Sequence, residues 1–204
     1  VLFETMKYTG PVDINCIIDF ATNKANFLEF TPRLGYNAIF AFCELLDVPL
    51  NEFLMELTFG NLFELPMSGG FGGALRVSIP PYPQEHGATD YSDKLVKLGS
   101  VVKRESIWPS DIKTDSSGAW KSAGCDGYLL DISAKGTTPY DIQGLIKESF
   151  DAISVIDKQA RLIDTFSKAQ KGYEYLCMNK FINKKEATHA VQPGRETAPT
   201  TLYS

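Results

Sequence analysis

The chain has 204 residues, of which 44% are hydrophobic and 22% charged, a composition that is ordinary for a globular protein with a sizeable core. Its formal net charge of −5 argues against a general nucleic-acid-binding protein, because neutralising phosphates requires clustered lysine and arginine. No apolar run approaches the roughly 20 residues that cross a bilayer, so we expect neither nucleic acid nor a membrane as a partner.

The ends and the cysteines indicate the context of the chain. Residues 1–8 have the pattern of the last turns of a helix, so we expect that an upstream half of the protein precedes them. The four cysteines lie far apart, without a CxxC pair, which indicates neither a zinc site nor a dense disulfide framework. We therefore expect buried, reduced thiols in a cytoplasmic protein. The four are Cys16, Cys43, Cys125 and Cys177.

The first regular element after Gly10 is a β-hairpin. Residues 12–20 are rich in β-branched side chains, residues 21–25 form a polar turn, and residues 26–30 form a second strand. This pattern predicts two antiparallel strands joined by a loop of about five residues.

Two helices are predicted next. Residues 37–46 are apolar on most faces, and Pro49 suits the first turn of a second helix, which has an apolar stripe and a natural stop at Gly60. We expect these helices to pack on the hairpin sheet.

The glycine group at residues 68–73 has the composition of a phosphate-binding loop. Such a loop follows a strand and opens a helix, whereas this group leads into an obvious strand at residues 74–79. We therefore interpret residues 63–73 as a flexible connector.

The second half predicts a mixed α/β unit. Short strands are expected within residues 84–126, and residues 128–133 form a longer strand. Thr138 can cap a following helix, with Asp141 returning a hydrogen bond to the cap. We expect this helix to continue through Ile156.

The predicted fold class is α/β (α+β): an antiparallel sheet with helices, followed by a small mixed α/β domain. The expected units are residues 1–62, the connector 63–73, the second domain 74–183 and a polar tail from residue 184 to residue 204.

The hairpin also carries the candidate chemistry. Asn15 on the first strand and Glu29 on the second can face the same way, close enough to hold one ion. A carboxylate and an amide are sufficient protein ligands for Mg²⁺ when a nucleotide supplies the rest. Arg33 offers a planar fork of donors suited to a phosphate. Taken alone, a Glu and an Arg at a strand end are more often a surface pair.

A resemblance adds to this interpretation. Residues 28–35, Leu-Glu-Phe-Thr-Pro-Arg-Leu-Gly, resemble the E-x-N-P-R-x-G signature of ATP-grasp enzymes. Residues 10–15, Gly-Pro-Val-Asp-Ile-Asn, are similar to the preceding strand in carbamoyl phosphate synthetases, where an amide at the position of Asn15 binds the metal.

The resemblance implies the roles of four residues. Glu29 would be a ligand of Mg²⁺ (or Mn²⁺) on the phosphates of ATP, Asn15 would be a second ligand that also contacts the cofactor, and Arg33 would be the catalytic group that steadies the transferred phosphoryl group. Thr31 stands where the family has asparagine. Its hydroxyl can ligate Mg²⁺ but is shorter, which puts a second ion, and full activity, in doubt.

A second resemblance covers most of the remaining chain. The strand at residues 74–79, the Pro-Tyr-Pro step at residues 81–83 and the strand–turn–helix at residues 127–138 look like the carboxy-terminal part of glycinamide ribonucleotide synthetases. That family has aspartate, proline and glutamate after the signature glycine, where residues 36–38 are Tyr-Asn-Ala here. Its arginine–aspartate ending is matched loosely by Arg161 and Asp164.

The implied function is that of a purine-biosynthetic carboxylate–amine ligase acting through an acyl phosphate, with small-molecule carboxylate and amine substrates and the upstream half as partner. Two alternatives remain open. The chain could be a catalytically inactive ATP-grasp descendant that serves as a binding or assembly module. It could also be an unrelated α/β protein in which Glu29 and Arg33 merely cap the hairpin.

Overall fold

The computed structural model describes residues 5, 7, 8, 10–19, 21–22, 24–60, 66–83 and 91–180. Most of the helix expected over residues 1–8, residues 63–65 of the expected connector and the tail from residue 184 lie outside these ranges. Among the described residues, no helix has the length and apolarity needed to cross a membrane.

The predicted hairpin is confirmed. Strand β1, Asp13–Asp19, pairs antiparallel with β2, Lys24–Thr31, and the two form a sheet of their own. Strand β2 begins two residues earlier than the sequence pattern indicated. The register shifts once, between Asn15 and Cys16, where a β-bulge interrupts the ladder.

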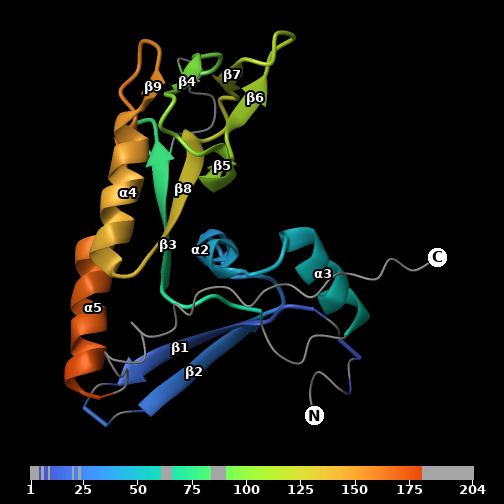
Figure 1. Cartoon of the computed structure of the whole chain (residues 1–204), viewed down its shortest axis with the longest axis vertical. Coiled ribbons are helices and arrows are strands. Elements are labelled where there is room, and N and C mark those ends of the chain that lie inside the picture. The colour runs from blue at the N-terminus through green and yellow to red at the C-terminus, as the bar shows by residue number, and fades with distance from the viewer. Residues whose placement is uncertain are drawn as a thin grey trace, which may run out of the picture.

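A second, four-stranded antiparallel sheet forms the centre of the molecule. Its order is β10–β3–β8–β5, with β3 at Phe71–Ser78, β8 at Tyr128–Gly136, β5 at Ile107–Pro109 and β10 at Arg161–Leu162. The hairpin lies across one end of this sheet and does not pair with it (Figure 1). The two sheets are thus separate.

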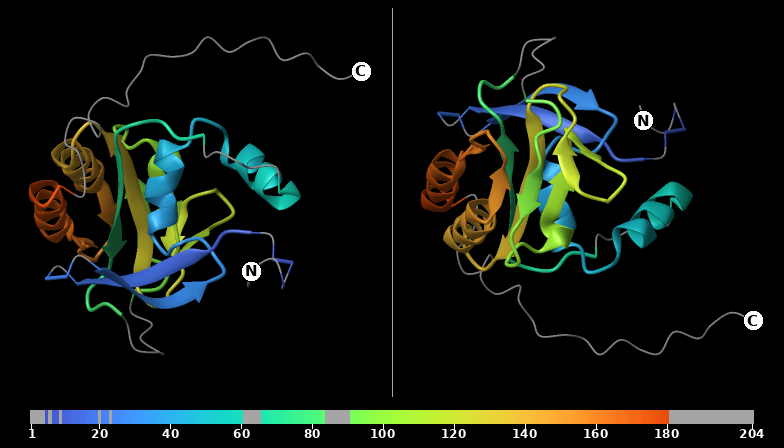
Figure 2. Two further views of the ribbon diagram at one scale, coloured as in Figure 1. Left: turned by 90° about the horizontal axis from the view of Figure 1, so that it is seen from below. Right: turned by 90° about the horizontal axis from the view of Figure 1, so that it is seen from above.

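Helices cover both faces of the central sheet (Figure 1, Figure 2). On one face lie α4, Pro139–Asp151, and α5, Phe166–Met178; on the other lies α2, Ala38–Leu45, against β3 and β8. Helix α3, Leu50–Phe59, follows α2 and ends at Gly60 in the left-handed conformation. The expectation that α2 packs on the hairpin sheet is therefore wrong, because the larger apolar surface of the central sheet takes this helix instead.

Two glycines of β3 explain how α2 and α4 come so close to the sheet. A Cβ at Gly72 would lie 2.3 Å from the carbonyl oxygen of Ala41 in α2, and a Cβ at Gly73 would lie 2.7 Å from Cγ2 of Ile142 in α4. The end of the expected flexible connector is thus strand, and its glycines serve close packing between layers.

The core lies between the central sheet and α4. Strand β8 is buried along most of its length, and Ile142 and Ile146 of α4 pack against it. Thr138 and Asp141 form the predicted capping box. The helix ends at Asp151, however, and β9, Ile153–Val155, follows it, so the helix predicted through Ile156 is too long.

Short strands fill the region between β3 and β8, as predicted. Strand β4, Val96–Leu98, pairs with β9, and β6, Ile112–Thr114, pairs with β7, Trp120–Ser122. A short 3-10 turn, η1, spans Arg104–Ser106.

The four cysteines are free, as expected, but they are not buried. Cys16 and Cys125 are exposed, and Cys43 and Cys177 are half-buried. Cys16 lies on the open hairpin and Cys125 in the turn before β8, and neither place has a layer above it.

A buried carboxylate organises the turn before β8. Asp111, only 4% exposed, accepts hydrogen bonds from the backbone N–H groups of Cys125 at 3.0 Å, Asp126 at 3.2 Å and Gly127 at 3.0 Å. Burial alone would raise the pKa of Asp111, but these backbone donors outweigh it and hold the pKa below the ordinary value.

Asp111→Asn should therefore destabilise the fold by about 1–3 kcal/mol at neutral pH. The NH2 group of the asparagine side chain would face backbone N–H groups, which are themselves hydrogen-bond donors and need an acceptor. The folded-state pKa lies below the unfolded one, so the stabilisation is present above the unfolded pKa of about 3.9 and is lost as pH falls through the folded value. Urea unfolding of both proteins across acidic pH measures this. A stability difference that stays constant below about pH 4 would contradict the assignment.

Candidate functional site

The hairpin presents four oxygen-bearing side chains on one face. Asn15 and Glu29 are register partners, and the Nδ2 of Asn15 donates to Oε1 of Glu29 at 3.3 Å. Asp13 pairs with Thr31 two residues along, and alternation places this pair on the same face. The prediction that Asn15 and Glu29 share a face is confirmed.

The sequence produces this arrangement through alternation. Ile14 and Phe30 are paired between the two polar pairs and therefore occupy the opposite face. The β-bulge comes directly after Asn15, so the regular alternation ends there. The polar face is consequently confined to the end of the hairpin that leads to Arg33.

Arg33 lies beside this face in a tight turn. Its backbone N–H donates to the carbonyl of Thr31 at 2.8 Å, and its Nη1 donates to the carbonyl of Leu34 at 3.0 Å. The same Nη1 lies 3.8 Å from Oδ2 of Asp13, and half of the arginine side chain, 52%, remains exposed. The guanidinium is thus oriented by the protein and open to a ligand.

The donor set fits a hard cation that takes most of its ligands from elsewhere. Among the described residues, no three His, Cys, Asp or Glu side chains gather into a group that could hold a metal. The hydrogen bond from Asn15 leaves its Oδ1 and the second carboxylate oxygen of Glu29 available, and Mg²⁺ characteristically combines one or two protein oxygens with water and phosphates.

Thr31, the departure from the family signature, lies where its hydroxyl can contact the first strand. Its Oγ1 donates to the backbone carbonyl of Asp13 at 3.4 Å. The carboxylate of Asp13 is the oxygen donor next to it on this face. Sequence reasoning missed Asp13, although its position two residues before Asn15 in a strand was a sufficient signal.

A second polar cluster faces the segment after the hairpin. The guanidinium carbon of Arg76 on β3 lies 4.0 Å from the ring centroid of Tyr128, 5.2 Å from that of Tyr82 and 5.9 Å from that of Tyr36. Its Nη1 donates to the hydroxyl of Tyr82 at 2.7 Å. The departure from the second family pattern therefore begins with Tyr36, a residue that touches this cluster.

The base of the cluster is a buried carboxylate. Asp131, the register partner of Arg76, is 1% exposed and accepts a hydrogen bond from the hydroxyl of Tyr128, and the oxygen of that hydroxyl also lies 3.2 Å from Oδ1 of Asn37. Burial raises the pKa of Asp131. Nε of Arg76 and Oδ1 of Asp131 are buried without a hydrogen-bond partner in the described chain. Sequence reasoning missed Arg76, whose signal was a charge inside an otherwise apolar strand.

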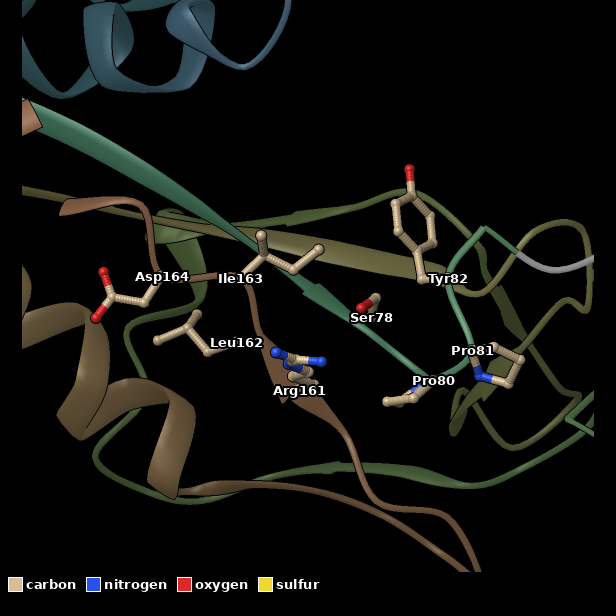
Figure 3. Close-up of a pocket in the computed structure, with 8 residues that line it drawn as sticks. All are labelled: Ser78, Pro80, Pro81, Tyr82, Arg161, Leu162, Ile163 and Asp164. Carbon is tan, nitrogen blue, oxygen red and sulfur yellow. The ribbon is translucent and has the colours of Figure 1, made fainter. Parts of the chain in front are cut away.

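A pocket of about 500 Å³ adjoins this cluster through Tyr82 (Figure 3). Pro80, Pro81 and Tyr82 form one side, and the segment from Arg161 to Asp164 forms the other, with Ser78 between them. Asp164 accepts hydrogen bonds from the backbone of Phe166 and from Gln143, both at 2.9 Å. Arg161 and Asp164, singled out in the sequence, thus line the same pocket. This pocket is separate from the face of the hairpin that carries Asn15 and Glu29.

Comparison with known proteins gives no match by sequence. No protein-family profile matches the chain, and no curated protein is detectably related to it.

Solved structures do match. Phosphoribosylamine–glycine ligase from Thermotoga maritima aligns with a TM-score of 0.57 and 14% identity, over 74% of this chain and 35% of that chain. The biotin carboxylase domain of 2-oxoglutarate carboxylase from Hydrogenobacter thermophilus was solved with MgADP, ADP and bicarbonate. It aligns with a TM-score of 0.51 and 12% identity, over 93% of this chain and 40% of that chain. The biotin carboxylase subunit of a pyruvate carboxylase aligns with a TM-score of 0.51 and 10% identity, over 78% of this chain and 34% of that chain.

This chain therefore spans between about a third and two-fifths of the enzymes that it matches. At these identities the likeness concerns the fold and leaves the substrate open. The chain has a mixed α/β fold like that of part of these enzymes, and a mixed α/β fold is what the sequence predicted.

Proposed function

We propose that this chain carries the metal-and-phosphate end of the active site of an ATP-dependent carboxylate–amine ligase. The observation that supports this most is the pairing of Asn15 with Glu29 on the hairpin face next to Arg33. In the reaction, the γ-phosphate of ATP passes to a substrate carboxylate to give an acyl phosphate. An amine then attacks the acyl carbon, phosphate leaves, and an amide forms.

The residues would act by position and charge. Glu29 and Asn15 would hold Mg²⁺ or Mn²⁺ on the nucleotide, and the bound ion would neutralise phosphate charge. Arg33, held by Leu34 and Asp13, would steady the transferred phosphoryl group. Asp13 supplies an oxygen beside the shorter Thr31 side chain, which favours an active enzyme over an inactive descendant.

The acceptor would approach from the side of Arg76. Arg76 carries a guanidinium whose Nη1 is held by the hydroxyl of Tyr82, and a carboxylate is the group that a guanidinium binds in two-point fashion. A phosphoribosylamine–glycine ligase-like reaction in purine biosynthesis, in the cytoplasm, is the specific form that we propose, because that enzyme's structure matches the chain and the sequence pattern led to the same family.

The partner of this chain would be the upstream half of the ligase, packed on the hairpin. A two-stranded hairpin is marginally stable alone. Here its apolar side chains are open to solvent: Ile14 is 57%, Ile17 is 58% and Leu28 is 56% exposed. A further layer would bury them and complete a nucleotide site between two units.

The competing proposal is an inactive binding or assembly module. It is favoured by the departure at Thr31, which removes the usual asparagine oxygen. Magnesium-dependent release of phosphate from ATP by the complete protein separates the two. Release that requires both a carboxylate and an amine supports the ligase, and no release under any acceptor mixture supports the inactive module.

Glu29→Gln in the complete protein should weaken the apparent Mg²⁺ affinity by about 10–100-fold, because the substitution removes the charge from the ligand while keeping its shape. Turnover measured against Mg²⁺ concentration tests this. Glu52→Gln, an exposed glutamate on α3, is the matched control and should leave the Mg²⁺ dependence unchanged. An unchanged Mg²⁺ dependence in Glu29→Gln would remove Glu29 from the site.

This chain alone should bind Mg-ATP more weakly than about 1 mM, because its contacts reach chiefly the metal and terminal phosphates, which water solvates well. Among the described residues, those of the hairpin do not line the pocket of Figure 3, so adenine gains no apolar contact from it to offset the entropy of association. Calorimetry with Mg-ATP is the measurement. Micromolar binding would mean that the nucleotide site is largely complete without an upstream half.

A further inference from the structure

A separate pocket lies on the other side of the central sheet from α2. It has a volume of about 290 Å³ and forms where the first turn of α4 meets the middle of α5 and the start of β3. No residue of the hairpin face, the Arg76 cluster or the pocket of Figure 3 lines it. The proposed ligase reaction therefore leaves this pocket without a role.

Its walls combine aromatic rings with one negative charge. Phe71, Tyr140 and Tyr173 contribute rings, and Phe71 and Tyr173 meet edge-to-face with centroids 5.3 Å apart. Glu174 is the only Asp, Glu, Lys, Arg or His among the described lining residues. The hydroxyl of Tyr140 donates to Oε1 of Glu174 at 3.3 Å, which ties the carboxylate to the rim of the aromatic wall.

The carboxylate of Glu174 has no cationic partner among the residues that the structure describes. No lysine or arginine lies within 4 Å of Glu174 in the described chain, and its Oε2 receives no hydrogen bond there. Gln170, one turn earlier on α5, is turned toward Gln143 of α4 at 3.4 Å. In the described chain, the pocket therefore places a carboxylate without a cationic partner beside three aromatic rings.

We propose that this pocket binds a small organic ammonium ion. The negative faces of aromatic rings attract cations, and rings combined with a carboxylate select ammonium groups over neutral or anionic ones. An anion would meet Glu174 with like charge and find no compensating cation.

The pocket can be tested with choline as the probe and its uncharged carbon isostere, dimethylbutanol, as the matched neutral ligand. Amide chemical shifts at constant ionic strength would be followed during titration. Choline should bind with a Kd on the order of 1–10 mM, as expected for a partly exposed site with a few cation–π contacts, and the isostere should bind at least about tenfold more weakly. n-Butylammonium distinguishes primary from quaternary ammonium ligands.

Two variants locate the binding. Glu174→Gln keeps the shape and should raise the choline Kd by at least about fivefold, and Tyr140→Ala, at a residue that is 61% exposed, should do the same without loss of fold. Glu52→Gln on α3 should leave the Kd unchanged. Equal binding of choline and the isostere, shifts centred away from α4 and α5, or no binding up to about 100 mM would each overturn the proposal.

Discussion

Arg33→Ala in the complete protein should lower kcat by about 10²–10³-fold while changing the affinity for ATP much less. Arg33 is oriented by the carbonyl of Leu34 and lies 3.8 Å from Asp13, so little reorganisation is needed when charge develops on the transferred phosphoryl group. Water can solvate the ground-state phosphates in its place but is not oriented for the transition state.

Steady-state kinetics together with ATP binding measured on the same variant separate these effects. Arg33→Lys is the informative companion, because it keeps the charge but loses the planar fork, and it should recover only part of the rate. Arg104→Ala, at an arginine in η1, which leads into β5 of the central sheet, should leave kcat unchanged. Equal losses in kcat and in ATP affinity would mean that Arg33 binds the nucleotide uniformly and has no special part in the transfer.

The hairpin was predictable because its information is local. Alternation fixes which side chains of one strand share a face. The register that runs from the turn to Cys16 and Phe27 would pair Asn15 with Leu28, and the β-bulge after Asn15 shifts it so that Asn15 pairs with Glu29. The family signature then pointed to the same residues. What the pattern left out was Asp13, which occupies the same face by the same rule.

The packing of the layers was not predictable in this way. Helix α2 is apolar on most sides, so its sequence does not say which sheet it covers. Residues 153–155 have a pattern that continues a helix, and they become strand β9 through pairing with β4, more than fifty residues earlier. The Arg76 cluster depends on three tyrosines that are brought together from distant segments. Each of these features rests on long-range contacts, which a local pattern cannot encode.

Gly72→Ala should destabilise the fold by about 3 kcal/mol, the largest effect that we expect from adding a single methyl group. The added Cβ would lie 2.3 Å from the backbone oxygen of Ala41, and it would also crowd the side chain of Leu45 at 3.1 Å. A backbone oxygen cannot turn aside as a flexible side chain can, so α2 would have to move away from β3. Because α2 directly follows the hairpin, this movement would also shift Tyr36 from Arg76.

Gly144→Ala is the matched control for this substitution. Gly144 lies on the exposed side of α4 with nothing within 4 Å of an added Cβ, so alanine should stabilise the helix by about 1 kcal/mol. Urea unfolding of both variants measures the difference in their free energies of unfolding. If the single Gly72→Ala variant does not fold, the same substitution is measured in the Gly144→Ala background. Gly72→Ala within about 0.5 kcal/mol of the parent would show that α2 can shift on the sheet at little cost, and that the glycines of β3 do not fix this interface.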